Sequence, residues 1–169
     1  MSTLHHRIWM FTNIFLIIGS IIYIWIVRPH TSVLIISSQL LAQMAIILFI
    51  INVNMYFIFL VIRKTPQRKI KISLANFSRK MMKWHIKIAL TATFIIIGHA
   101  SINIFHLGPI VGYSHLKMVT GYFSGLLLIP TLLAGYLRHK KASGFRKKLH
   151  RTVAITFVVM FLIHMLTSL

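Results

Sequence analysis

Five long apolar runs dominate this chain of 169 residues. The runs cover residues 8–27, 33–62, 82–105, 116–137 and 149–168. Each is close to the roughly twenty residues that cross a hydrocarbon core of about 30 Å as a helix, and soluble domains rarely carry runs of this kind. The sequence therefore predicts an all-α integral membrane protein, a bundle of five transmembrane helices that forms one domain over residues 1–169.

The charged residues of the chain have one sign only. The sequence contains 19 Lys and Arg and 10 His but no Asp, no Glu and no Cys. Without carboxylates there can be no carboxylate metal site, general acid or proton relay, and without thiols there is no disulfide, iron–sulfur cluster or covalently attached haem. Histidine is therefore the residue type left in quantity to hold a metal.

The basic residues are distributed unevenly along the chain. When the five runs cross a membrane alternately, every Lys and Arg except Arg28 and Lys117 falls on one side. By the positive-inside rule this side is cytoplasmic, which places the N-terminus inside. A long basic connection over residues 63–81, with Pro66 in it, is expected between the second and third spans. The net charge of +19 then indicates contact with anionic lipids and an acidic protein partner, and no nucleic acid.

Four histidines recur at one spacing on two of the spans. His85 and His99 stand fourteen residues apart in the third span, and His150 and His164 stand fourteen apart in the fifth. Fourteen residues come within roughly 40° of four helical turns and rise about 21 Å, so each pair lies on one helix face. Both spans run from inside to outside, so each span presents one inner and one outer imidazole.

Two imidazoles that face each other across a helix bundle are the axial ligands of a six-coordinate haem. We therefore expect two haem b groups, with one haem as the alternative: an inner haem held by His85 and His150, and an outer haem held by His99 and His164. Polar residues inside membranes are costly and tend to mark function. The competing interpretation is that each histidine is a buried hydrogen-bonding group or an interfacial anchor.

Basic side chains at the level of the inner haem are candidates for contact with the haem propionates. They are Lys83, Lys87, Lys148 and Arg151, although lysines that snorkel at a membrane boundary would form the same pattern. Three glycines, Gly98, Gly121 and Gly125, would let a macrocycle or a neighbouring helix come close.

The stretches KWHIKIALTATFIIIGHASINIF and FRKKLHRTVAITFVVMFLIHM resemble the haem-binding core of membrane dihaem b-type cytochromes, the ferric-reductase-like and cytochrome b561-like groups. The likeness covers residues 80–168. In the ferric-reductase-like group, two helices separated by one other each bear two haem-ligating histidines, often with Leu-His-Arg opening the second. His85 and His99 match the first of these helices, while Leu149–Arg151 and His164 match the second.

The b561-like arrangement is the less fitting of the two. It spreads the four ligands over four helices, in which case His115 would compete with His99 or His164 as a ligand, and the second span offers no histidine for it. No flavin or nicotinamide domain follows the haem-binding stretch, so electrons are expected to come from a partner protein or a quinol.

A second site is predicted at the outer side. A quinone headgroup needs hydrogen-bond donors and a proton acceptor, and a set of polar residues near the outer haem's level offers them: His106, Tyr113, His115, Gln39 and Gln43. The alternative is a polar connection with Gly-Pro turn chemistry.

The expected function is transmembrane electron transfer, as the membrane cytochrome b subunit of a respiratory or other redox complex that contacts further redox subunits and a quinone. Two other functions remain open, a histidine-lined metal or ion transporter and a structural membrane subunit without cofactor. The expected location is the bacterial cytoplasmic membrane, with the mitochondrial inner membrane as the alternative.

Overall fold

The computed structural model describes residues 2–28, 30–141 and 143–167, and nearly all of them are helical. In chain order the elements are α1 (Ser2–Ile22), the π-helical η1 (Tyr23–Val27), α2 (Val33–Lys64), α3 (Arg68–Ile102), the π-helical η2 (Asn103–Leu107), α4 (Gly108–Val111), α5 (Leu116–Lys140) and α6 (Gly144–Leu166). Residue 168, the last of the predicted fifth span, lies outside the described residues.

Five helical segments are long and apolar enough to cross a membrane. They are Arg7–Val27, Val33–Lys64, Arg68–Val111, Leu116–Lys140 and Gly144–Leu166. The all-α class and the five predicted spans are therefore confirmed, and the chain is an integral membrane protein. The second and fourth spans begin at the predicted residues, Val33 and Leu116.

Contacts divide the chain into two compact units. The N-terminal unit, Met1–Ser101, contains α1, η1, α2 and nearly all of α3, and the C-terminal unit, Ile102–Leu169, contains η2, α4, α5 and α6. His85 and His99 belong to the first unit, and His150 and His164 belong to the second.

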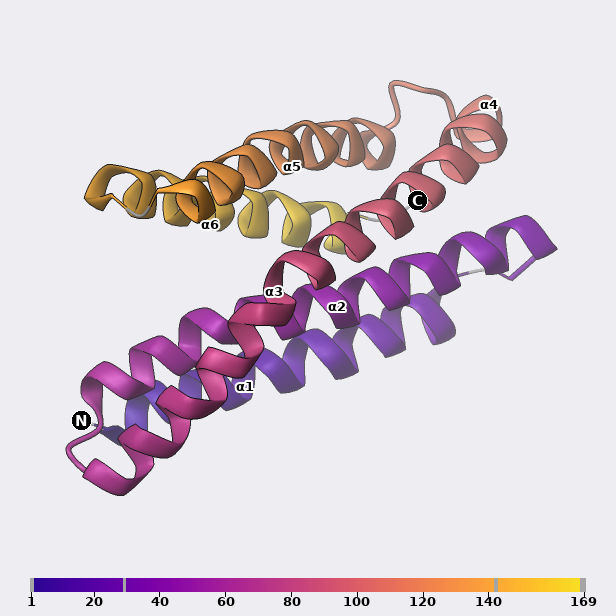
Figure 1. The fold of residues 1–169 in the computed structure, drawn as a ribbon. Helices are drawn as coiled ribbons and strands as arrows, with labels where there is room; N and C mark the ends of the chain where they lie inside the picture. Colours follow the sequence, from indigo (N-terminus) through magenta and orange to yellow (C-terminus); the bar gives the residue numbers. More distant parts are fainter. Residues whose placement is uncertain (1, 29, 142, 168–169) are drawn as a thin grey trace. The chain divides into compact units, whose positions relative to one another are not determined.

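In the N-terminal unit, α1 lies along α2 (Figure 1). Two groups of polar contacts join them: Asn54 of α2 exchanges hydrogen bonds with Asn13 at 2.7 and 3.0 Å and accepts one from Trp9, and Gln43 donates to Ser20 at 3.3 Å. Ser20 is fully buried. Lipid tails give apolar helices little reason to associate, so such polar contacts help to fix the pair.

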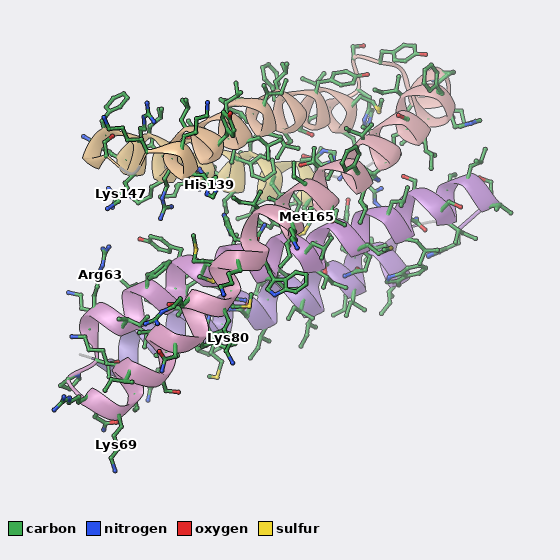
Figure 2. The ribbon with its side chains drawn as sticks, viewed as in Figure 1. Arg63, Lys69, Lys80, His139, Lys147 and Met165 are labelled. Carbon is green, nitrogen blue, oxygen red and sulfur yellow. The ribbon has the colours of Figure 1, made fainter. Side chains whose placement is uncertain are left out.

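The predicted long loop over residues 63–81 is wrong. Helix α2 continues to Lys64 and α3 begins at Arg68, which leaves only residues 65–67 as the connection. Pro66 cannot continue a helix, but the Lys, Arg, Leu, Ala and Met residues after it favour one. Figure 2 shows Arg63, Lys69 and Lys80 projecting from this part of the unit.

In the C-terminal unit, α5 and α6 form an antiparallel hairpin (Figure 1). Two hydroxyls cross between them, Ser124 Oγ to Met160 O at 3.3 Å and Thr131 Oγ1 to Val153 O at 3.4 Å. A residue later in α5 therefore contacts a residue earlier in α6, as expected for antiparallel helices, and these two contacts fix the register of the hairpin. Ser143 caps the N-terminus of α6 by accepting from the Arg146 N–H at 3.2 Å.

Candidate functional site

Each predicted histidine pair lies within one continuous helix. His85 and His99 are both in α3, and His150 and His164 are both in α6. All four side chains are partly buried. Because no break interrupts either helix between its two histidines, the fourteen-residue spacing keeps each pair on one helix face, about 21 Å apart along the axis.

The imidazole of His99 is anchored by α2. Its Nδ1 lies 3.0 Å from the backbone oxygen of Ser38 and 3.1 Å from the Ser38 hydroxyl, and Ser38 is buried. A carbonyl oxygen can only accept, so Nδ1 carries the proton in this arrangement. In the neutral ring the lone pair is then on Nε2, which is the nitrogen that would ligate a metal.

The imidazole of His164 is anchored in the same way by α5. Its Nδ1 lies 3.2 Å from Thr120 Oγ1. The Thr120 hydroxyl has one proton, which it donates to the backbone oxygens of its own helix: that of Leu116 lies 2.9 Å away and that of Lys117 lies 3.1 Å away. Toward His164 this hydroxyl therefore accepts, which again puts the imidazole proton on Nδ1 and the lone pair on Nε2.

Two glycines of α5 lie against the two histidines of α6. A Cβ atom at Gly121 would lie 3.1 Å from Cε1 of His164, and one at Gly135 would lie 3.3 Å from Cε1 of His150. The glycines are fourteen residues apart, as the histidines are, so the antiparallel hairpin pairs them one to one. Each imidazole thus lies close to the α5 backbone, where a side chain would crowd it.

The other glycines have different surroundings. Around Gly125 there is open space, so this residue does not contact a histidine ring. At Gly98 a Cβ would lie 3.4 Å from Leu41 Cδ1, which indicates close approach of the neighbouring helix α2. The sequence predicts close approach at Gly121 and Gly125 of α5 but not at Gly135. The matching fourteen-residue spacing of Gly121 and Gly135 was the signal that could have found it.

The basic residues expected near the inner haem, Lys83, Lys87, Lys148 and Arg151, are all exposed. Lys87 lies over the Trp84 ring, with Nζ 4.9 Å from its centroid. Figure 2 shows Lys147 and His139 projecting near the turn between α5 and α6. Exposed ammonium and guanidinium groups fit both contact with propionates and contact with lipid headgroups.

The residues of the predicted quinone site are divided between the two units. In the N-terminal unit Gln39 is buried and Gln43 contacts Ser20. In the C-terminal unit His106 and Tyr113 are exposed, and the quinone site remains a prediction.

Two residues of the connection between α4 and α5 have structural roles. The Tyr113 ring lies against Gly108, where a Cβ would come within 2.5 Å of it. His115 caps the N-terminus of α5, since its Nδ1 accepts from the Lys117 N–H at 3.2 Å. With Nδ1 used as an acceptor, the His115 proton is on Nε2, the opposite tautomer from that of His99 and His164.

In the part of the chain that the structure describes, no three histidines gather into a group able to hold a metal ion. A bis-histidine haem needs only two, and the pairing of α3 histidines with α6 histidines stays a prediction. Comparison with protein-family models, with curated proteins and with solved structures finds no match for this chain.

Proposed function

We propose that this protein carries electrons across a membrane through two b-type haems. His85 and His150 ligate the inner iron, and His99 and His164 ligate the outer iron. The observation that carries the proposal is the shared anchoring of His99 and His164: Nδ1 of His99 lies 3.0 Å from the Ser38 backbone oxygen and Nδ1 of His164 lies 3.2 Å from Thr120 Oγ1, so that Nε2 is the nitrogen that would ligate iron in each. Metal-ligating histidines typically donate their second ring nitrogen in this way, because the bond fixes both tautomer and ring orientation.

The donor set of the chain fits this cofactor. Each haem iron needs two neutral imidazoles and no carboxylate or thiolate, and the chain offers histidines but no Asp, Glu or Cys. Gly121 and Gly135 keep the α5 side of two of these rings free of side-chain bulk. When bound, the haem supplies a one-electron Fe(III)/Fe(II) couple, and with both axial positions filled by protein it favours electron transfer over oxygen binding.

The distribution of charge gives the proposed orientation. The ends of α2 and α5 and the beginnings of α3 and α6 carry nearly all the basic residues, so these ends lie in the cytoplasm and the N-terminus is inside. Arg28 and Lys117 lie on the outer side. The cytoplasmic surface contacts anionic lipids and acidic redox subunits, and a quinone exchanges electrons at the outer side.

Single and double histidine variants test the proposal. His99→Ala and His164→Ala should each lose the same one of two haems, the double variant should lose no more, and His85→Ala and His150→Ala should lose the other. His139→Ala, an exposed histidine of α5, is the control and should keep both. Four variants that each retain the wild-type haem content would reject the ligand set and favour a structural role for these histidines.

A further inference from the structure

Positive charge gathers where α5 passes into α6. Helix α5 ends at Lys140 and α6 begins at Gly144, and the stretch RHKKASGFRKKLHR, residues 138–151, contains seven Lys and Arg. We name this stretch the basic turn. Outside it, the C-terminal unit has one further Lys or Arg, Lys117. Five of the seven cations are exposed: Lys140, Lys141, Lys147, Lys148 and Arg151.

Hydrogen bonds hold the two helix ends of the basic turn together. Arg146 Nη1 donates to the backbone oxygen of Leu137 at 2.9 Å, which joins the first turn of α6 to the last turn of α5. The hydroxyl of Ser143 accepts from the Arg146 N–H at 3.2 Å. The exposed cations therefore project from a fixed corner of the hairpin and not from a long loop.

The basic turn has no acidic side chain to pair with. The sequence contains no Asp and no Glu, so its cations form no salt bridge with a side chain of this sequence. The end of α6 at Leu166 lies about 33 Å along the helix from Gly144, so the terminal carboxylate, three residues further on, cannot reach the turn. A surface with charges of one sign attracts a partner of the opposite sign from solution.

The basic turn adjoins His150, the proposed α6 ligand of the inner haem. On α6, His150 follows Lys147 by three residues and directly precedes Arg151. On α5, the residue that lies against its ring is Gly135, five residues before Lys140. At about 1.5 Å per residue, the exposed cations of both helices therefore lie within roughly 10 Å of His150 along the hairpin.

We propose that the basic turn is the docking surface for an acidic, water-soluble redox protein that delivers electrons to the inner haem. This inference rests on the proposed function and names its cytoplasmic partner. The carrier gives up one electron, the inner iron gains it as Fe(III) becomes Fe(II), and no bond forms or breaks. Opposite charges speed association and select the partner. Lipid headgroups also bind cations, but only a redox partner makes use of their place beside His150.

The first readout of the test is binding, which does not depend on haem. A fluorescently labelled acidic flavodoxin is the probe, and its anisotropy is followed as purified protein in neutral detergent is added at low ionic strength. We expect saturable binding that weakens as salt is added, and no binding of the basic protein cytochrome c. In stopped flow, the reduced flavodoxin should reduce haem at a rate that falls with salt in the same way.

Variants locate the docking surface. A triple variant that combines Lys140→Gln, Lys141→Gln and Lys147→Gln removes three exposed charges and should weaken flavodoxin binding by about tenfold. Arginine at the same three positions keeps the charges and should retain the wild-type affinity. The matched control replaces three exposed lysines of the N-terminal unit with glutamine, namely Lys69, Lys71 and Lys80, and should bind flavodoxin like the wild type.

The outcomes separate this inference from the proposed function. Purified wild-type protein without haem rejects the proposed function before any lysine variant is made. Protein that contains two haems but binds flavodoxin equally with and without the three lysines of the basic turn overturns the docking surface and leaves the proposed function standing. Equal weakening in the two triple glutamine variants would show that overall charge attracts the probe, and would overturn the assignment to this turn.

A lipid site at the same place has its own signature. If the triple glutamine variant of the basic turn loses co-purified phosphatidylglycerol but keeps its affinity for flavodoxin, the turn binds lipid headgroups and the docking surface is overturned. A loss of flavodoxin affinity with unchanged lipid content supports the docking surface.

Discussion

The Nδ1 atom of His99 lies 3.0 Å from the backbone oxygen of Ser38, on the neighbouring helix of the same unit. The Nδ1 atom of His164 lies 3.2 Å from the hydroxyl of Thr120, on the neighbouring helix α5. Both bonds fix the same imidazole tautomer, but one depends on the main chain and the other on a side chain. The two anchors should therefore respond differently to substitution.

Removing the two hydroxyls should show this difference. Thr120→Val keeps the shape of the side chain and removes the acceptor for His164, so we expect haem affinity at the outer site to fall by about 10- to 100-fold. Ser38→Ala leaves the backbone oxygen in place and should change the affinity far less. Haem transfer to an excess of an apo-globin acceptor measures both rates of loss, and equal loss from the two variants would argue against the anchoring.

Bulk at the glycines of α5 should displace the histidine rings. Gly121→Val should cost the protein its outer haem and Gly135→Val its inner haem, because even a Cβ at these positions would lie 3.1 and 3.3 Å from the respective ring. The matched control is Gly125→Val, which adds the same side chain to the same helix where nothing lies within 4 Å. Haem content per purified chain is the measurement; identical content in all three variants would contradict the contacts.

The contact between α1 and α2 should contribute measurable stability. Asn54→Leu removes the partner of both Trp9 and Asn13, and we expect it to destabilise the protein by about 1 kcal/mol, a typical value for polar contacts between membrane helices. Asn52→Leu is the control, since the side-chain oxygen of Asn52 is buried and receives no hydrogen bond in the described part of the chain. Thermal unfolding in detergent should show a lower Tm for Asn54→Leu only.

The proposed orientation can be read with single cysteines, because the natural chain has none. Ser114→Cys, before α5, should react with a membrane-impermeant maleimide in intact cells, and Ser143→Cys, between α5 and α6, should react only after lysis. The positive-inside rule predicts this result from the basic residues around Ser143. The reverse labelling pattern would place the N-terminus outside.

The sequence predicts the long helices well because an apolar run of about twenty residues has few alternatives to a membrane helix. It predicts the connection over residues 63–81 badly, because a run of charges suggests a loop although Lys, Arg and Met are good helix formers. The π-helical segments η1 and η2 depend on local packing and leave no pattern in the sequence.

The candidate site, too, is only partly predictable from the sequence. Hydropathy and spacing place His85, His99, His150 and His164 on two helices, but neither indicates which face of α5 packs against α6. Thr120 and Gly135 are therefore not predicted from the sequence. The contacts of Thr120 and Gly135 with the histidines follow from the register of the hairpin, which the contacts between α5 and α6 fix.

If one chain holds two bis-histidine haems, the haem content of the purified protein will show it. A reduced-minus-oxidised visible spectrum, combined with haem extraction and protein quantification, gives the number of b-type haems per chain. We predict a low-spin b-type spectrum with two haems per chain. Protein that is folded and membrane-inserted but contains no haem would contradict the proposed electron-transfer function, and one haem per chain would contradict an inner and an outer histidine pair.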